Sequence, residues 1–343
     1  MKKINLAING FGRIGRQAFK IALEKPEIEI VAINDLTSPQ VLAHLLKYDT
    51  NYGIYPKEIG FDGNHIIVDG KKIVVVAEKD PALLPWGKMG IDVVIESTGR
   101  FTDSEKSSAH LKAGAKKVVI SAPAKDAGAT KTIVLSVNDA AYKGEQIISN
   151  ASCTTNCIAP VARVLVDKFG IEKIMMTTIH SYTAEQNLVD GPPPGGHSTD
   201  LRRARSAPNN IVPTTTGATI AAAEAIPQLK GLFHGMSVRV PTPVGSLSDF
   251  VALLSRKTTK EEVNQAFIDA SKDKNFAGIL SVSNEPLVSS DIVGNPSSTI
   301  VDLGLTEVID GDFVKVVAWY DNEFGYSNRL VEEVLLVAKP LIK

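Results

Sequence analysis

Three glycines at a fixed spacing constrain this chain more than any other feature of its sequence. Gly10, Gly12 and Gly15 stand between the apolar run "INLAIN" (Ile4–Asn9) and the helically spaced "RIGRQAFKIALEK" (Arg13–Lys25). A Gly-x-Gly-x-x-Gly pattern between a strand and a helix is typical of a βαβ unit that binds a dinucleotide. In such a unit, Gly10 allows the tight turn, Gly12 lets the backbone approach a pyrophosphate, and Gly15 lets the helix pack close to the strand.

An acidic residue follows the next strand candidate, "EIVAIN" (Glu29–Asn34), at the position that a dinucleotide site requires. Asp35 lies twenty residues after Gly15, where a carboxylate suits the hydroxyls of an adenosine ribose. Residues 36–38 are Leu, Thr and Ser, so no basic side chain is adjacent to accept a 2′-phosphate. The pattern predicts NAD rather than NADP. The alternative is a glycine turn in an ordinary βα unit, with Asp35 as a helix cap or loop carboxylate.

The two halves of the chain differ in the pattern of their apolar residues. The first half alternates short apolar runs with helical patterns, which predicts βαβ units and a mostly parallel sheet. A hairpin over Asn64–Glu78 is expected to turn at Asp69-Gly70. The predicted fold class is α/β: a Rossmann-type doubly wound parallel sheet domain over residues 1–151, and an α+β catalytic domain with a mainly antiparallel sheet over residues 152–318.

Composition narrows the classes of partner. The 343 residues include 37 Lys and Arg against 38 Asp and Glu, a balance that favours small molecules over nucleic acid. No apolar run approaches the eighteen or so residues of a membrane span, and the run before Gly10 is too short for a signal-peptide core. Two cysteines cannot form a disulfide framework, so reduced thiols and a cytoplasmic location are expected.

Both cysteines lie in "SNASCTTNC" (Ser149–Cys157), where cap-forming residues precede an apolar periodic run. Cys153 is therefore expected near a helix N-terminus, where the dipole favours a thiolate nucleophile. Lowering a thiol pKa of about 8.5 by two units requires roughly 2.7 kcal/mol. A helix end contributes about 0.5–2 kcal/mol, so an imidazolium nearby is expected to supply the rest. The alternative for Cys153 is a buried structural thiol, and Cys157 is expected in the core.

One histidine qualifies as the partner of Cys153. His180 ends the strand-like run "IMMTTIH" in the same half of the chain, where a base at a strand end would face a cleft. The alternative is a hydrogen-bonded structural histidine. No metal site is expected, because neither cysteine nor any histidine pairs with another at ligand spacing; the histidines are His44, His65, His110, His180, His197 and His234.

Several long motifs together resemble the phosphorylating glyceraldehyde-3-phosphate dehydrogenases. These are "NGFGRIGR", "SNASCTTNC" and "WYDNEFGYS" (Trp319–Ser327), with "ESTGRF", "TTIHSYT", "PTTTGA" and "RVPTP" in the family's order across essentially the whole chain. The resemblance implies NAD-dependent phosphorylating oxidation of D-glyceraldehyde 3-phosphate to 1,3-bisphosphoglycerate, a reaction of glycolysis and gluconeogenesis. Cys153 would form a thiohemiacetal and then a thioester, with His180 as base and inorganic phosphate as the second substrate.

The resemblance also implies residue roles. Cofactor contacts would come from Gly10, Phe11, Gly12, Arg13, Ile14, Gly15, Asp35, Lys79, Thr98, Gly99, Ser121, Asn322 and Tyr326. The substrate's phosphate would be held by Thr183 and Arg239. The attacking phosphate would be held by Ser152, Thr154, Arg205, Thr216 and Gly217, with Arg203 near. On the residues alone, the cluster of Arg202, Arg203 and Arg205 equally suits a solvated basic face.

Family members are homotetramers, in which the loop corresponding to Asp190–Asn210 lines the core interface, and the C-terminal helix, expected over residues 319–343, would pack on the first domain. This chain departs from the usual pattern in a longer "GPPPGGHST", in "PTPVGSLSDF", and in Ile220 in place of a common lysine. Two alternatives share part of this pattern. An erythrose-4-phosphate dehydrogenase would share the cysteine and histidine, and a non-catalytic NAD-binding module would share only the fold.

Overall fold

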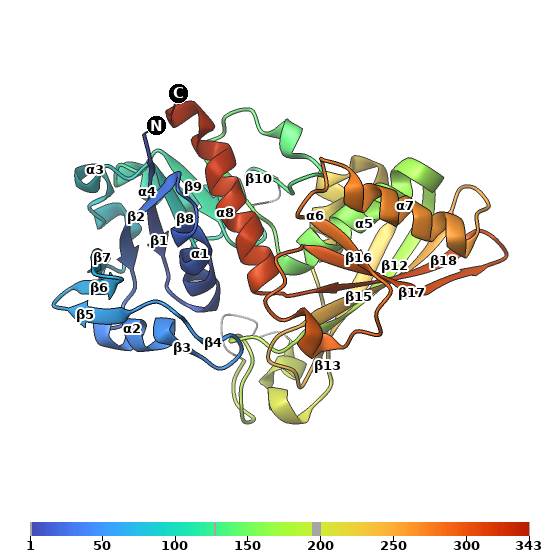
Figure 1. Ribbon diagram of the computed structural model, residues 1–343, viewed down its shortest axis with the longest axis horizontal. Coiled ribbons are helices and arrows are strands. Elements are labelled where there is room, and N and C mark those ends of the chain that lie inside the picture. The colour runs from blue at the N-terminus through green and yellow to red at the C-terminus, as the bar shows by residue number, and fades with distance from the viewer. Residues whose placement is uncertain (1, 127, 194–199, 343) are drawn as a thin grey trace. The chain divides into compact units, whose positions relative to one another are not determined.

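The computed structural model describes residues 2–126, 128–193 and 200–342. Within these residues the chain forms two compact units (Figure 1). Unit 1 contains the described residues of Met1–Ile133, Asp139–Ser152 and Ser327–Lys343, and unit 2 contains those of Val134–Asn138 and Cys153–Tyr326. No helix in the described part of the chain is both long enough and apolar enough to cross a bilayer.

Unit 1 is built on a nine-stranded sheet with the order β10-β11-β9-β8-β1-β2-β7-β6-β5. Seven neighbouring strands, β10 to β7 in this order, run parallel, and β6 and β5 add an antiparallel edge. The strands are β1 (Ile4–Asn9), β2 (Ile28–Asn34), β5 (Ile59–Asp62), β6 (His65–Val68), β7 (Lys71–Val76), β8 (Val93–Glu96), β9 (Lys117–Ile120), β10 (Lys131–Thr132) and β11 (Ile147–Ser149).

Helices lie between the parallel strands of unit 1 in the chain, as the predicted doubly wound fold requires. They are α1 (Arg13–Leu23), α2 (Pro39–Lys47), α3 (Trp86–Met89) and α4 (Ser104–Lys112), and a separate short ribbon pairs β3 (Tyr48–Asp49) with β4 (Gly53–Ile54). Helix α8 (Phe324–Ala338) follows the last strand of unit 2 and belongs to unit 1 from Ser327 onward. Strand β1 lies between β2 and β8, so the strand order reverses beside it. Ligands of such folds bind outside the carboxyl ends of the strands at this switch point. The hairpin turn at Asp69-Gly70 is confirmed, because both residues have positive φ (49° and 79°).

The glycines after β1 have the conformations that their predicted roles require. Gly10 has a φ of +92°, in the left-handed region that favours glycine. A Cβ on Gly15 would lie 2.1 Å from the carbonyl oxygen of Gly10, so α1 approaches β1 too closely for any side chain. A Cβ on Gly12 would meet no atom within 4 Å. Gly10 and Gly15 are therefore steric requirements, and Gly12 leaves open space beside the backbone.

Unit 2 has a seven-stranded sheet of order β13-β14-β12-β15-β18-β17-β16. The sheet is mainly antiparallel, as predicted, and only β12 with β14 and β16 with β17 pair in parallel. Helix α5 packs against both α6 and α7, and Figure 1 shows the three helices on one side of the sheet. The elements are α5 (Cys153–Phe169), α6 (Ala218–Ala225), α7 (Lys260–Lys272), β12 (Ile171–Ser181), β13 (Val212–Thr214), β14 (Phe233–Val240), β15 (Ser246–Leu254), β16 (Leu280–Ser283), β17 (Thr299–Ile309) and β18 (Phe313–Tyr320).

The C-terminal helix begins later than residue 319, where it was predicted. Trp319 and Tyr320 end β18 because their backbones continue its antiparallel pairing with β15. The carboxylate of Asp321 then accepts hydrogen bonds from the N–H groups of Glu323 (2.9 Å) and Phe324 (2.8 Å). These bonds satisfy donors of the first helical turn and start α8 at Phe324.

Gly15→Ala is expected to destabilise the protein by about 2 kcal/mol or more, because overpacking against a fixed backbone outweighs the better helix propensity of alanine. Gly12→Ala, which adds the same methyl group in open space, is expected to change the free energy of unfolding far less. Urea unfolding of both variants measures the difference. Equal stability of the two variants would contradict the close approach of α1 to β1.

Candidate active site

A pocket of about 290 Å³ lies in unit 1 at the switch point beside β1. It is lined at the ends of β1, β2 and β8 and by the segment that follows β7. Five of the predicted cofactor residues line it, namely Gly10, Gly12, Asp35, Lys79 and Thr98. The structure adds seven residues that the sequence analysis did not assign: Asn9, Asn34, Leu36, Glu78, Ser97, Arg100 and Phe101. Most of these residues end a predicted strand or follow it closely. Only the pairing of the strands shows which of them share the pocket.

The carboxylate of Asp35 is fixed at this pocket by two backbone donors. It accepts from the N–H groups of Phe11 (2.8 Å) and Thr37 (2.9 Å). A held carboxylate at the end of β2 and open space beside Gly12 fit the ribose and pyrophosphate of NAD. No positive side chain occurs among residues 36–38 to accept a 2′-phosphate.

Other predicted cofactor residues lie near the pocket with their side chains engaged elsewhere. The ring of Phe11 packs edge-on against Phe19 at 5.3 Å between centroids. The guanidinium of Arg13 pairs with Asp49 at 2.8 Å. Ile14 lies in the first turn of α1, whose backbone N–H groups are the usual donors to a phosphate. Gly99 follows Thr98 with a φ of +72°, and Ser121 follows β9.

The two predicted reactive side chains meet within unit 2. Cys153 is the first residue of α5, and His180 is the last but one of β12. Their Sγ and Nε2 atoms lie 3.4 Å apart. Cys153 as a residue is partly exposed, and His180 is buried. Ala151, two residues before the thiol, has a φ of +53°, a conformation that costs a non-glycine residue about 1–2 kcal/mol. The backbone therefore turns sharply into α5.

The proton on His180 can be assigned from its neighbours. Nδ1 lies 2.7 Å from the backbone oxygen of Ser181, which only accepts, so Nδ1 carries the proton and donates it. Arg239 Nη1 donates to the same oxygen at 3.2 Å, and its 3.3 Å approach to Nδ1 is a contact between two donors. Nε2 is therefore an unprotonated acceptor that faces the thiol. This is the arrangement of a general base beside a nucleophile.

The electrostatics of the pair differ from the prediction. Burial, and next the charge of Arg239, lower the pKa of His180 to about 3. Burial is the largest influence on the Cys153 thiol and raises its pKa, with Arg239 acting in the opposite direction. Both directions oppose the predicted thiolate–imidazolium pair, because burial disfavours the charged form of each side chain. At neutral pH the pair is a thiol beside a neutral base.

A network of charged groups adjoins His180. The register of β12 and β14 places Arg239 directly beside His180. Arg239 Nη1 donates to the hydroxyl of Thr183 at 3.1 Å, and Nη2 donates to Glu185 Oε1 at 2.9 Å. Arg203 donates to the same carboxylate oxygen at 2.5 Å. Among the described residues, the buried Nε of Arg239 has no hydrogen-bond partner. Two guanidinium groups thus share the carboxylate of Glu185, and Arg203 also pairs with Asp200 at 3.5 Å.

The remaining residues predicted for phosphate lie on other elements. Arg205 is exposed and pairs with Asp190 at 2.8 Å. Thr216 and Gly217 precede α6, where the Thr216 hydroxyl accepts from the N–H of Ala218 at 3.2 Å. Ser152 precedes α5. Arg203, which was expected to contribute less than Arg205, is the buried member of the arginine cluster, so a solvated basic face does not describe it.

Tyr320 is a site residue that the sequence analysis did not assign. Its hydroxyl lies between those of Thr154 (2.9 Å) and Thr178 (2.8 Å), and its ring meets His180 edge-on at 6.0 Å between centroids. Burial raises the pKa of this phenol. The hydroxyl thereby joins α5, β12 and β18. The only sequence signal was its position in the motif "WYDNEFGYS".

Asn322 is held by hydrogen bonds within unit 2. Its Oδ1 accepts from the N–H of Gly245 and from the hydroxyl of Ser246, each at 3.0 Å. The Nδ2 group is thus the part of the side chain that can donate to a ligand. Tyr326 is buried in α8. Among the described residues, no group of three or more His, Cys, Asp or Glu side chains is arranged to hold a metal, and His197 lies outside those residues.

Comparisons with known proteins show the family of this chain. The family model "Glyceraldehyde 3-phosphate dehydrogenase, NAD binding domain" matches residues 4–104, and the model "Glyceraldehyde 3-phosphate dehydrogenase, C-terminal domain" matches residues 152–322. The chain is 53% identical to the glyceraldehyde-3-phosphate dehydrogenase of Geobacillus stearothermophilus over 98% of both chains. It is 54% identical to that of Mycobacterium tuberculosis H37Rv, over 98% of this chain and 99% of the relative.

The dinucleotide fold of unit 1 and the thiol and imidazole of unit 2 define an NAD-dependent oxidoreductase. The chain belongs to the glyceraldehyde-3-phosphate dehydrogenase family.

The low pKa of His180 predicts a loss of stability in acid. An unfolded histidine titrates near 6.5, so between that pH and about 3 the unfolded state binds a proton that the folded state excludes. The free energy of unfolding should therefore fall by about 2 kcal/mol more between pH 8 and pH 5 in the native protein than in His180→Asn. Urea titrations at each pH measure this difference. Parallel pH profiles of the two proteins would contradict a neutral, buried His180.

Proposed function

We propose that this chain oxidises D-glyceraldehyde 3-phosphate to 1,3-bisphosphoglycerate with NAD and inorganic phosphate, through a thioester on Cys153. The observation that carries the proposal is the 3.4 Å approach of Cys153 Sγ to the unprotonated Nε2 of His180. We also propose residues 1–151 as the NAD-binding domain and residues 152–318 as the catalytic domain.

The first step would be attack of the sulfur on the aldehyde carbon. As the S–C bond forms, His180 Nε2 takes the thiol proton, and the Nδ1–H bond to the carbonyl of Ser181 stabilises the imidazolium that results. Backbone N–H groups at the start of α5 would stabilise the oxyanion before it is protonated to the thiohemiacetal.

The later steps reuse the same base. His180 would remove the hydroxyl proton of the thiohemiacetal, and the oxidised carbon would remain on Sγ as a thioester. Bound NAD supplies the hydride acceptor. Inorganic phosphate would then attack the thioester carbon, which releases the acyl phosphate and returns the sulfur of Cys153 as a thiolate for reprotonation.

Substrate binding would make His180 a stronger base. The guanidinium of Arg239 lies close to His180 and lowers the pKa of its imidazole. A substrate phosphate held by Arg239 and Thr183 would offset that positive charge and raise the pKa of His180. The site would thus gain a stronger base only when an anionic substrate is present. This supports an aldehyde that carries a phosphate.

The proposed contacts follow the family resemblance together with the geometry above. NAD would be held by Gly10, Phe11, Gly12, Arg13, Ile14, Gly15, Asp35, Lys79, Thr98, Gly99, Ser121, Asn322 and Tyr326. The attacking phosphate would be held by Ser152, Thr154, Arg203, Arg205, Thr216 and Gly217. We further propose a cytoplasmic homotetramer, which light scattering would report as a mass near four times the 36.7 kDa of one chain.

Turnover of the purified protein tests the reaction. NADH should accumulate from glyceraldehyde 3-phosphate and NAD only when inorganic phosphate is present, and Cys153→Ser should abolish it. His180→Asn should lower kcat by roughly 10²- to 10⁴-fold, the usual contribution of a general base.

Sustained turnover without phosphate would mean that water resolves the thioester, and erythrose 4-phosphate would then be the substrate to test. Measurable NAD binding with no turnover of either aldehyde would leave only the non-catalytic module.

Arg239→Lys should raise the KM for glyceraldehyde 3-phosphate by roughly tenfold or more, because a lysine cannot reproduce the charge-assisted hydrogen bonds of a guanidinium. Arg202→Lys, an equivalent change at an exposed arginine, serves as the control. Steady-state kinetics at saturating NAD and phosphate measure both values. A KM in Arg239→Lys that matches the control would remove Arg239 from the substrate site.

A further inference from the structure

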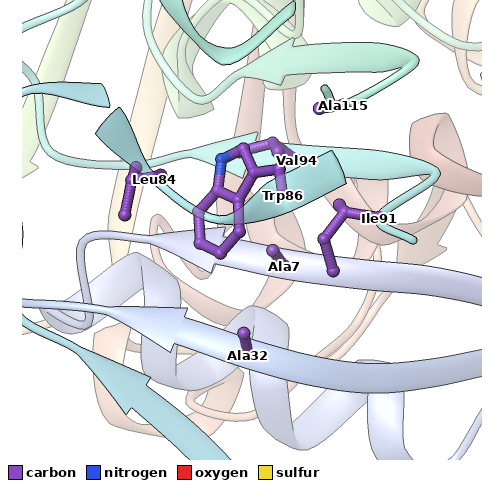
Figure 2. Close-up of a cluster of buried hydrophobic side chains, with 7 residues drawn as sticks. All are labelled: Ala7, Ala32, Leu84, Trp86, Ile91, Val94 and Ala115. Atoms are coloured by element: carbon purple, nitrogen blue, oxygen red, sulfur yellow. The ribbon is translucent and has the colours of Figure 1, made fainter. Parts of the chain in front are cut away.

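A chain of buried hydrogen bonds lies beneath the nucleotide pocket and is not explained by the mechanism. It begins at Trp86, whose indole packs in an apolar cluster of unit 1 (Figure 2), with the ring nitrogen at the edge of the ring. That nitrogen donates to Nδ1 of His110 at 3.0 Å. His110 Nε2 lies 2.9 Å from a carboxylate oxygen of Glu96. All three side chains are almost completely buried.

The direction of these hydrogen bonds is determined by the first donor. An indole N–H can only donate, so Nδ1 of His110 must accept and the proton of the ring must lie on Nε2. His110 is therefore a neutral imidazole that donates to Glu96. An imidazolium, with a proton on each nitrogen, would oppose the N–H of Trp86.

A second line of donors reaches Glu96 from the other side. The backbone N–H of Glu78 donates to Oδ1 of Asn34 at 2.9 Å, which orients that amide. Asn34 Nδ2 then donates to Oδ1 of Asn9 at 2.6 Å, and Asn9 Nδ2 donates to Glu96. The N–H and the hydroxyl of Thr98 donate to the other oxygen of Glu96. Four donors thus converge on one carboxylate, and only a group that accepts at both oxygens satisfies them.

This network orders the pocket itself. Asn9, Asn34, Glu78 and Thr98 all line the pocket, and they come from the ends of β1, β2 and β8 and from the segment after β7. We propose that Glu96 is a positioning residue that holds these pocket residues in place for the ADP half of NAD. The proposal rests on the NAD-dependent function proposed above, and it assigns His110 and Trp86 the task of keeping every donor directed at Glu96.

Glu96→Gln tests the need for an acceptor at both oxygens. The amide keeps the shape of the carboxylate, but either of its orientations turns an NH2 group toward two donors. The Kd for NAD and the Kd for ADP-ribose should both rise at least tenfold, while kcat at saturating NAD should remain within twofold. Glu105→Gln, which makes the same change at an exposed position of α4, should leave both Kd values unchanged. Isothermal titration calorimetry measures the binding.

A double variant separates positioning from general structural support. In Trp86→Phe/Glu96→Gln, the indole donor is gone, so His110 can move its proton to Nδ1 and accept from the new amide at Nε2. ADP-ribose should then bind at least threefold more tightly than it binds to Glu96→Gln alone. A network that only supports the fold would show additive damage instead, because a buried hydrogen bond is lost in addition.

The remaining outcomes of these experiments also bear on the proposed role of Glu96. Unchanged ADP-ribose binding in Glu96→Gln, with a lower Tm, would overturn the proposal, as would a double variant that binds more weakly than Glu96→Gln. If Glu96→Gln does not fold, Trp86→Phe alone should weaken ADP-ribose binding about threefold, and unchanged binding would overturn the proposal. A native protein that binds neither NAD nor ADP-ribose would refute the proposed function instead.

Discussion

The hydrogen bond from His180 Nδ1 to the carbonyl of Ser181 is the interaction on which the arrangement of Cys153 and His180 in unit 2 depends. Because a carbonyl oxygen only accepts, it holds the proton on Nδ1 and leaves Nε2 to face the thiol of Cys153. Arg239 strengthens this arrangement, since its charge opposes a second proton on the ring. The base is therefore neutral before substrate arrives, and the substrate's own phosphate would supply the charge that allows it to accept a proton.

In unit 1 a hydrogen-bond donor, instead of an acceptor, fixes the position of the proton on a histidine. There a group that only donates, the indole of Trp86, determines the proton position on His110 and directs it toward Glu96. Buried networks of this kind are costly when any member is unsatisfied, so they maintain a single arrangement of the backbone ends that they connect. In both units a group with one hydrogen-bonding role fixes the position of the proton on a histidine: a backbone carbonyl for His180 and an indole N–H for His110.

Much of the fold could be predicted from local patterns in the sequence. The glycine spacing, the acid after the second strand and the alternation of strands and helices predicted a doubly wound sheet, and the sheet of unit 1 confirms it. The start of the last helix was wrong because "WYDNEF" joins a strand to a cap, and only the pairing of β18 with β15 shows where the strand ends. Cys153 and His180 were found because their local contexts, a capped helix start and a strand end, are visible in the sequence.

By itself, the sequence determined the fold class and the dinucleotide fingerprint, and it singled out Cys153 and His180 as the candidates for nucleophile and base, because each of these inferences depends on residues near one another in the chain. Only the tertiary structure decided the ionisation of Cys153 and His180, since burial and the approach of Arg239 depend on how β12 and β14 align. The hydrogen-bond partners of Tyr320 and Glu96 were likewise decided there. Their partners come from strands and helices far apart in the chain, and hydrogen bonds between such residues exist only once the sheets have formed.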